Sequence, residues 1–198
     1  MHRLPLLLVA AFAAAVLLPS PAAAQPAPQG FAVGVLGGVE TWSLEIDERE
    51  YGPAVEGFGR YTLESGLQFA VGFTYSSMNV DAVSDNREVW DIWGDVRVVM
   101  TNWNAASGYI GARGGYVNQS LSTTINAQPL DISASGWMGA AEIGLLVELS
   151  RTLALDALGL FGFSGTGDLE ADGVSVDRPV NTAWIGGLKL GLVFSFPR

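Results

Sequence analysis

The chain has 198 residues and a formal net charge of −10, because 20 acidic side chains stand against 10 lysines and arginines. An acidic chain offers no electrostatic attraction for phosphate backbones, so we expect no nucleic-acid partner. Cysteine is absent, which excludes disulfides and thiolate chemistry. Hydrophobic residues nevertheless make up 49% of the chain, and their pattern has to decide whether they face a core or a membrane.

Residues 1–24 have the organisation of a secretory signal peptide. A basic start at His2 and Arg3 is followed by an apolar run over 4–18, and three alanines at 22–24 precede the predicted cleavage site. The apolar run is shorter than the ~20 residues that a membrane-spanning helix needs. We therefore predict a cleaved leader rather than an anchor.

The mature chain would begin at Gln25, with a short flexible linker over 25–30 and a single folded domain over 31–196. Its charge would be 9 − 20 = −11, since Arg3 leaves with the leader. Within the domain, apolar and polar side chains alternate in blocks, which predicts β-strands. The eight predicted strands are 31–42, 54–61, 67–76, 89–100, 109–119, 136–149, 153–164 and 182–196.

Within each predicted strand the charges share one face. They are Glu56 and Arg60 in the second strand, Asp91, Asp95 and Arg97 in the fourth, and Glu142 and Glu148 in the sixth. The opposite faces are apolar and aromatic, from Leu67 to Tyr75, Trp90 to Met100, Trp137 to Leu149 and Trp184 to Phe196. A soluble sandwich would bury the apolar face, whereas a membrane barrel turns it to lipid and the charges to the lumen. Alternation alone does not separate the two.

Three features favour the membrane. Aromatic residues lie near the ends of the apolar faces, as interfacial girdles do: Tyr61, Tyr75, Trp90, Trp137, Trp184 and Phe196. Connections alternate between short (62–66, 101–108, 150–152) and long (43–53, 77–88, 120–135, 165–181), as periplasmic turns and extracellular loops do. An even strand count then leaves both termini on the periplasmic side.

Eight strands enclose a lumen that side chains can fill, so charges inside it must pair. The charges that we place inside are Glu56, Asp91, Asp95, Arg97, Arg113, Glu142, Asp156 and Lys189. Strand order predicts one ion-pair group of Asp95, Arg113 and Glu142, with Lys189 beside Asp156. Six glycines on the same face are expected to make room for the long charged side chains: Gly34, Gly72, Gly111, Gly115, Gly187 and Gly191.

The last strand alternates up to Phe196 and almost ends the chain. With the leader, the eight strands and the luminal charges, this resembles the small OmpA/OmpX-type barrels of the outer membrane protein beta-barrel domain family. The resemblance implies an all-β, eight-stranded antiparallel up-and-down transmembrane β-barrel in the bacterial outer membrane. It also implies contact with outer-membrane lipid and lipopolysaccharide, and recognition by the barrel assembly machinery at Phe196. Such chains commonly stop at the aromatic residue, whereas Pro197 and Arg198 follow here.

The sequence predicts no catalytic residue and no cofactor. The outer-membrane barrel enzymes resemble one another in using an active-site histidine, and the only histidine here, His2, lies in the predicted leader. Asp91 and Asp95 remain a candidate pair for general acid–base chemistry. Two carboxylates four residues apart on one strand face are more often ion-pair partners, here of Arg97 or Arg113.

No metal ligand is predicted either, although Asp168 to Gly173 has the acidic spacing that begins a calcium loop. The twelfth position is Pro179 instead of glutamate, so we interpret the segment as a solvated acidic loop. Loose divalent-cation bridging to lipopolysaccharide phosphates is an alternative, which Glu45, Asp47, Glu48 and Glu50 would join.

The leading functional hypothesis is a non-enzymatic outer-membrane barrel with a charged, plugged lumen and acidic extracellular loops, which has a structural role or presents a surface for partners. One alternative is a narrow pore for small solutes or ions. Another is a soluble, lipocalin-like ligand carrier, whose barrel would hold apolar residues inside and charges outside.

Overall fold

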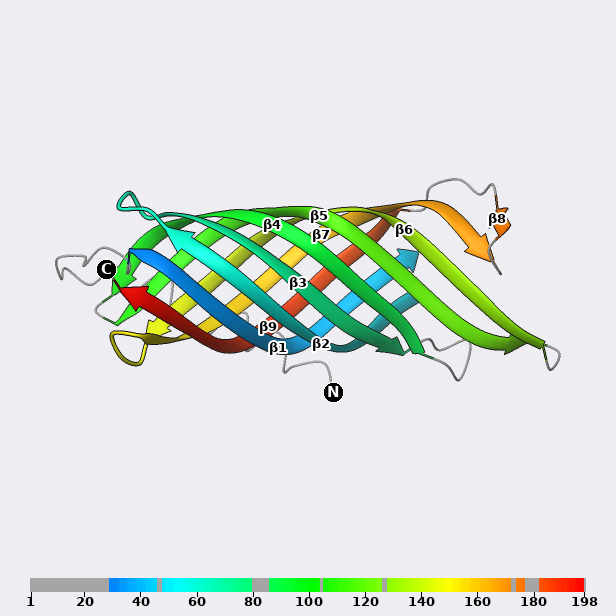
Figure 1. The fold of residues 1–198 in the computed structure, drawn as a ribbon, viewed down its shortest axis with the longest axis horizontal. Helices are drawn as coiled ribbons and strands as arrows, with labels where there is room; N and C mark the ends of the chain where they lie inside the picture. The colour runs from blue at the N-terminus through cyan, green and yellow to red at the C-terminus, as the bar shows by residue number, and fades with distance from the viewer. Residues whose placement is uncertain are drawn as a thin grey trace.

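The computed structural model describes residues 29–45, 48–79, 86–103, 105–125, 128–171, 174–176 and 182–197. The predicted signal peptide and residues 25–28 of the predicted linker lie outside them. The strands are β1 Gly30–Glu45, β2 Glu48–Thr62, β3 Leu67–Asn79, β4 Asn86–Trp103, β5 Ala106–Ile125, β6 Gln128–Glu148, β7 Leu153–Ala171, β8 Val174–Val176 and β9 Thr182–Pro197 (Figure 1). Among these residues, a helix apolar and long enough to traverse a bilayer does not occur.

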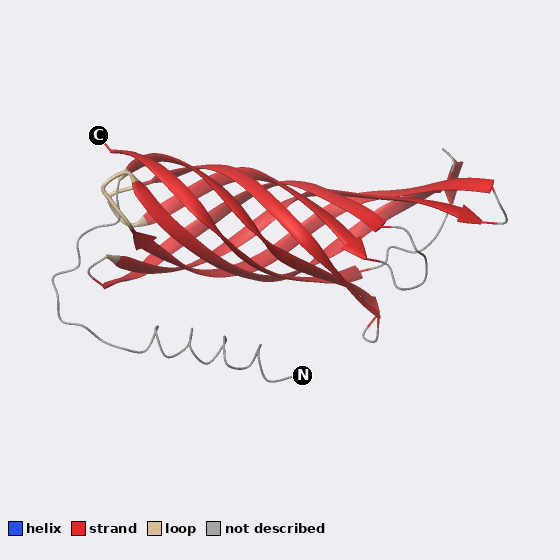
Figure 2. Ribbon diagram, turned by 90° about the horizontal axis from the view of Figure 1, so that it is seen from below, coloured by secondary structure: helices blue, strands red, loops and turns tan. Residues whose placement is uncertain are grey.

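The strands form a closed antiparallel barrel. Each of β1 to β7 pairs with the next, and β9 pairs with both β7 and β1, so eight strands complete the ring (Figure 2). The three-residue β8 stands outside the ring and pairs only with the end of β7. Closure leaves no strand edge in the ring unpaired, which is the condition for placing strands in lipid. The predicted all-β up-and-down barrel is confirmed.

The register fixes the tilt of the strands. A path along paired residues leaves β1 at Ala32 and returns to it at Trp42, through Arg60, Ala70, Asp95, Arg113, Ala140, Gly162 and Ile185. The return is displaced by 42 − 32 = 10 residues. Such a stagger requires strands that cross the barrel wall obliquely, with tilts of ~35–45°.

The strands extend further than the sequence predicts at the end with the long connections. The β5–β6 hairpin continues to Ile125 and Gln128, where a loop over 120–135 was expected. Figure 1 shows this hairpin and the end of β7 projecting beyond the other strands. The prediction ended each strand where apolar alternation ends. Ladder hydrogen bonds, however, continue in water with polar residues on both faces. At the other end, β4 runs to Trp103 and β5 starts at Ala106, so the connection predicted over 101–108 is much shorter.

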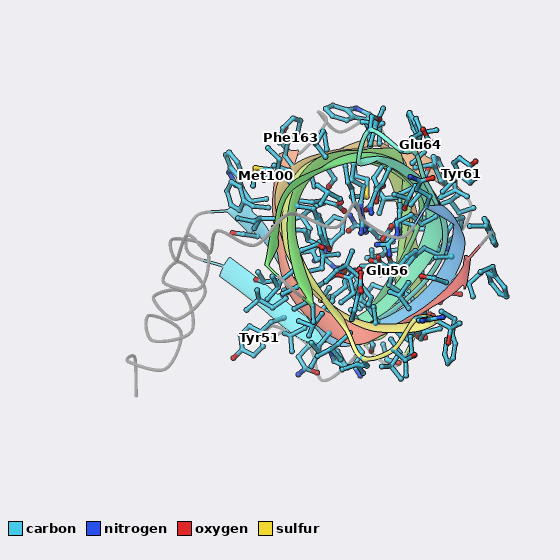
Figure 3. The ribbon with its side chains drawn as sticks, turned by 90° about the vertical axis from the view of Figure 1, so that its left-hand side faces the viewer. Tyr51, Glu56, Tyr61, Glu64, Met100 and Phe163 are labelled. Atoms are coloured by element: carbon cyan, nitrogen blue, oxygen red, sulfur yellow. The ribbon has the colours of Figure 1, made fainter. Side chains whose placement is uncertain are left out.

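The outer wall carries the apolar face. Val71 is 69% exposed, Leu190 is 53% exposed and Phe194 is 51% exposed. In Figure 3, which looks along the barrel, Tyr51, Tyr61, Met100 and Phe163 point away from the ring and Glu56 points into it. This is the inverse of a soluble ligand carrier, so the lipocalin-like alternative is wrong.

Aromatic side chains collect at two levels of this wall. Near the long connections, ring contacts join Trp90 to Phe73 and Tyr116, Trp137 to Phe163, and Phe161 to Trp184. Near the short turns, Phe69, Tyr61, Phe31 and Phe196 are successive cross-strand neighbours, and the Phe31 and Phe196 rings lie 6.0 Å apart. Twelve residues separate Trp184 from Phe196 on β9. At ~3.3 Å per residue and ~40° tilt this is about 30 Å, the thickness of a bilayer's hydrocarbon core.

The inward glycines serve a purpose different from the predicted one. A Cβ at Gly34 would overlap the Phe58 ring, and one at Gly72 would overlap the Trp93 ring. At Gly115 and Gly191 a Cβ would meet the neighbouring strand's backbone. Of the six, only Gly111 and Gly187 have a charged side chain among their closest neighbours. The narrow lumen therefore needs glycine mainly to seat two aromatic rings and to let tilted strands approach.

Candidate functional site in the barrel lumen

The eight charges predicted to lie in the lumen all do so. Each is at most 5% exposed: Glu56, Asp91, Asp95, Arg97, Arg113, Glu142, Asp156 and Lys189. They are held there by strand alternation, because one register of β2, β4, β5, β6, β7 and β9 turns every one of them inward. Arg60, which was predicted to share the charged face of its strand with Glu56, is buried too. Glu40 is also buried but was not placed inside from the sequence, although it shares the inward parity of its strand.

Arg113 lies at the centre of the buried charges. Its guanidinium donates two hydrogen bonds to Glu56, at 2.8 and 2.9 Å. It also contacts Glu142 at 2.5 Å and Asp95 at 4.0 Å, so the predicted group of Asp95, Arg113 and Glu142 is present. The predominant partner, Glu56, was missed because β2 and β5 meet only across the lumen. The Trp93 ring lies under the guanidinium, 3.5 Å from its carbon to the ring centroid, and contributes a cation–π contact.

Arg97 organises the charges nearer the short turns. It donates two hydrogen bonds to Asp95 Oδ2, at 2.9 and 2.6 Å, and contacts Glu142 at 3.0 Å. Asp156 lies 3.7 Å from Arg97 and 3.5 Å from Arg60, and accepts a 2.8 Å hydrogen bond from the Tyr109 hydroxyl. Several partners for each charge offset the desolvation that a single buried pair seldom repays.

Lys189 does not pair with Asp156 as strand order suggested. Its ammonium lies 2.6 Å from Glu40 and 2.7 Å from Glu56. The cross-strand partner of Asp156 on β9 is Gly191, two positions nearer the short turns than Lys189. The flexible lysine side chain therefore meets the carboxylates of β1 and β2 instead.

A cluster of buried apolar side chains lies inside the barrel above the charges, on the side of the long connections. This apolar cluster consists of Trp42, Met78, Val89, Val117, Met138, Ala140, Leu160, Ala183 and Ile185. Beyond it, Arg87 forms an ion pair with Glu50. At the short-turn end a depression lined by Arg60, Gln68 and Ser107 leaves about 20 Å³, room for about one water molecule.

The two carboxylates considered for acid–base chemistry have different surroundings. Asp95 contacts both Arg97 and Arg113. Asp91 is 4% exposed and forms no ion pair with any residue that the structure describes. Asp95 is thus an ion-pair partner of the arginines, as the sequence predicted for both carboxylates. Asp91 is not.

The segment with calcium-loop spacing ends a strand. Residues 169–171 of β7 pair with residues 174–176 of β8 in an antiparallel hairpin, a geometry unlike a calcium loop between helices. Residues 172 and 173 lie outside the described part of the chain, as does Asp47, and the side chains of Glu45 and Glu48 are not described. Within the described residues, no three histidine, cysteine or acidic side chains gather as metal ligands.

A closed barrel with an apolar wall, two aromatic levels and charges inside defines a transmembrane β-barrel. The sequence matches the family model described as "Outer membrane protein beta-barrel domain" over residues 10–177, and the chain belongs to this family. The family's place is the bacterial outer membrane.

Solved structures of outer-membrane proteins share the fold. Neisserial surface protein A superimposes with a TM-score of 0.67 at 18% identity, covering 86% of this chain and 99% of its own. OprG from Pseudomonas aeruginosa superimposes with a TM-score of 0.59 at 10% identity, covering 89% of this chain and 100% of its own. Ail, the attachment invasion locus protein of Yersinia pestis, superimposes with a TM-score of 0.53 at 13% identity, covering 85% of this chain and 99% of its own. A comparison with curated protein sequences found no match.

Proposed function

We propose that the protein is a non-enzymatic barrel with a plugged lumen, which stabilises the outer membrane and presents acidic extracellular hairpins to surface partners. The observation that supports the plug is a set of ion pairs that reaches across the lumen. Glu56, Arg113 and Glu142 join charges from β2, β5 and β6 across its width, and an apolar cluster lies above them. Because eight strands enclose a lumen that side chains can fill, we expect these paired side chains to block a continuous water path.

Charge distribution supports the orientation. The segments 43–53, 77–88, 120–135 and 165–181 hold 12 acidic residues and 3 arginines, a net charge of −9, whereas the short turns hold only Glu64 and Arg151. The acidic end is proposed to face outward, with both termini in the periplasm, since Gly30 and Pro197 are paired at the opposite end. Divalent cations would then link the acidic hairpins to lipopolysaccharide phosphates.

Single-channel recording in planar bilayers tests the plug. The mature chain, folded in detergent and shown to be heat-modifiable, is expected to insert without discrete conductance steps. The same detergent without protein sets the baseline. Reproducible steps that scale with salt would contradict the plug and favour the narrow pore, the alternative that the lumen's width still permits.

We propose that Phe196 is the contact for the barrel assembly machinery. It ends the outward face of β9 and stacks on Phe31 at the seam where the first and last strands meet. Phe196→Ala is expected to lower the amount of folded, membrane-inserted protein several-fold while secretion continues. Leu190→Ala, on the same strand face but away from the seam, is the matched control. Equal folded levels in both variants, measured by heat modifiability, would refute the proposal.

A further inference from the structure

The lumen holds more buried acid than base. Its buried carboxylates are Glu40, Glu56, Asp91, Asp95, Glu142 and Asp156, and its buried cations are Arg60, Arg97, Arg113 and Lys189, with Arg87 set apart by its pair with Glu50. Among the residues that the structure describes, six buried acids against four buried bases leave an excess of two negative charges. Isolated buried charge is strongly unfavourable, so the excess must be neutralised.

Asp91 is the one carboxylate of these six that has no cation beside it. Each of the other five carboxylates lies within 4.0 Å of at least one cation. Asp91 has no such partner among the described residues, and its Oδ1 atom is buried without a hydrogen-bond partner. Glu40, whose Oε2 atom is likewise unpartnered, disfavours an ionised Asp91, whereas Lys189 and Arg113 favour the ionised form.

The hydrogen bonds around Thr74 indicate what neutralises Asp91. The Trp93 indole donates to Thr74 Oγ1 at 3.1 Å, and the Thr74 hydroxyl donates to Glu56 at 3.4 Å. Asp91 is the cross-strand neighbour of Thr74 and shares the inward face with it. A hydroxyl has one hydrogen and accepts two bonds, so it cannot donate to two carboxylates at once.

A proton on Asp91 is compatible with these hydrogen bonds. A protonated Asp91 carboxyl can donate to Thr74 Oγ1, while that oxygen accepts a second bond from Trp93 and its own hydrogen goes to Glu56. A metal ion does not fit as well, because no set of three acidic side chains in the described residues is arranged to hold one. The nearest inward positions on the neighbouring strands are likewise uncharged: Gly72 and Ser76 on β3, and Gly115, Val117 and Gln119 on β5.

We propose that Asp91 is a proton-binding group of the lumen, uncharged in the folded barrel at neutral pH. It rests on the plugged lumen proposed above. The unfolded chain exposes Asp91 to water, where it is ionised at neutral pH. The folded state therefore binds one proton more than the unfolded state, and folding weakens as pH rises, by up to about tenfold in the equilibrium constant per pH unit.

Equilibrium urea unfolding of the full mature chain in lipid vesicles, from pH 5 to pH 9, tests this. Asp91→Asn replaces the carboxyl with an uncharged group of the same shape. It is expected to fold at least as well as the parent at neutral pH and to lose the weakening at higher pH. Asp95→Asn is the matched control, since it is on the same strand and face with similar burial. It removes a partner of two arginines and should unfold at lower urea throughout.

Two results would overturn the proposal. In the first, Asp91→Asn loses as much stability to urea as Asp95→Asn does, and its stability depends on pH as in the parent. That result would mean that Asp91 is ionised in the folded barrel. The other is a parent barrel that is more stable in sodium salt than in the salt of a bulky organic cation at equal ionic strength, when Asp91→Asn shows no such difference. That result would mean that a metal ion neutralises Asp91. If Asp91→Asn does not fold, the infrared carbonyl band of a protonated carboxyl in the folded parent at neutral pH decides, and its absence rejects the proposal. If conductance steps appear while Asp91→Asn still removes the weakening at higher pH, only the plugged lumen is rejected.

Discussion

Arg113→Met is expected to lower the free energy of unfolding by roughly 3–5 kcal/mol, the range for removing one partner of a buried ion pair. Glu56 would lose both of its guanidinium hydrogen bonds and keep Lys189 as its cationic partner, while Glu142 would keep Arg97 as its cationic partner. The Trp93 ring would lose the cation that stacks on it. Urea unfolding of the barrel in lipid measures the loss.

Rescue identifies the partner that matters. Glu56→Gln combined with Arg113→Met should recover part of the loss, because position 56 then no longer carries the charge that Arg113 had balanced. The recovery is read as a coupling energy. Neutralising Asp95 should recover less, since it lies 4.0 Å from Arg113 and keeps Arg97. Arg151→Met, in an exposed turn, is the control and should change stability by less than about 0.5 kcal/mol. Parent stability in Arg113→Met would mean a solvated guanidinium and a wetter, pore-like lumen.

Val71→Arg is expected to cost ~2–4 kcal/mol when the barrel is folded in a bilayer, because it places a charge on the lipid face near the midplane. Val71 is 69% exposed on the outer wall, so no protein group is available to pair with the arginine. Leu192→Arg should behave similarly. The measurement is again urea unfolding, here in vesicles instead of micelles, since the penalty comes from lipid.

Position relative to the membrane supplies the controls. Leu63→Arg makes a similar change in the exposed β2–β3 turn, where the penalty should fall to ~0–1 kcal/mol. Val193→Thr changes an inward position and should cost much less than Val71→Arg. Equal free-energy costs for Val71→Arg and Leu63→Arg would mean that the outer wall does not face lipid. A larger cost for Val193→Thr than for Val71→Arg would mean that the strand register is wrong by one residue.

The alternation of apolar and polar residues was sufficient to predict the fold and the side chains that face the lumen. A strand turns successive side chains to opposite faces, so one register per strand placed Glu56, Asp91 and Arg97 inside and Val71 and Phe194 outside. The outward aromatic residues, such as Trp184 and Phe196, likewise follow from parity and from their place near the strand ends. These properties are local, because each depends on neighbouring residues along one strand.

Contacts across the lumen were decided only by the tertiary structure. Sequence order places Arg113 between β4 and β6, but the stagger of ten residues brings it level with Glu56 on β2, and brings Lys189 level with Glu40. The glycines show the same limit, since Gly34 and Gly72 admit the Phe58 and Trp93 rings from adjacent strands rather than charged chains. The sequence by itself determined which side chains enter the lumen. Closure of the tilted ring decided which of them meet, because ion-pair partners depend on heights around the barrel that no single strand encodes.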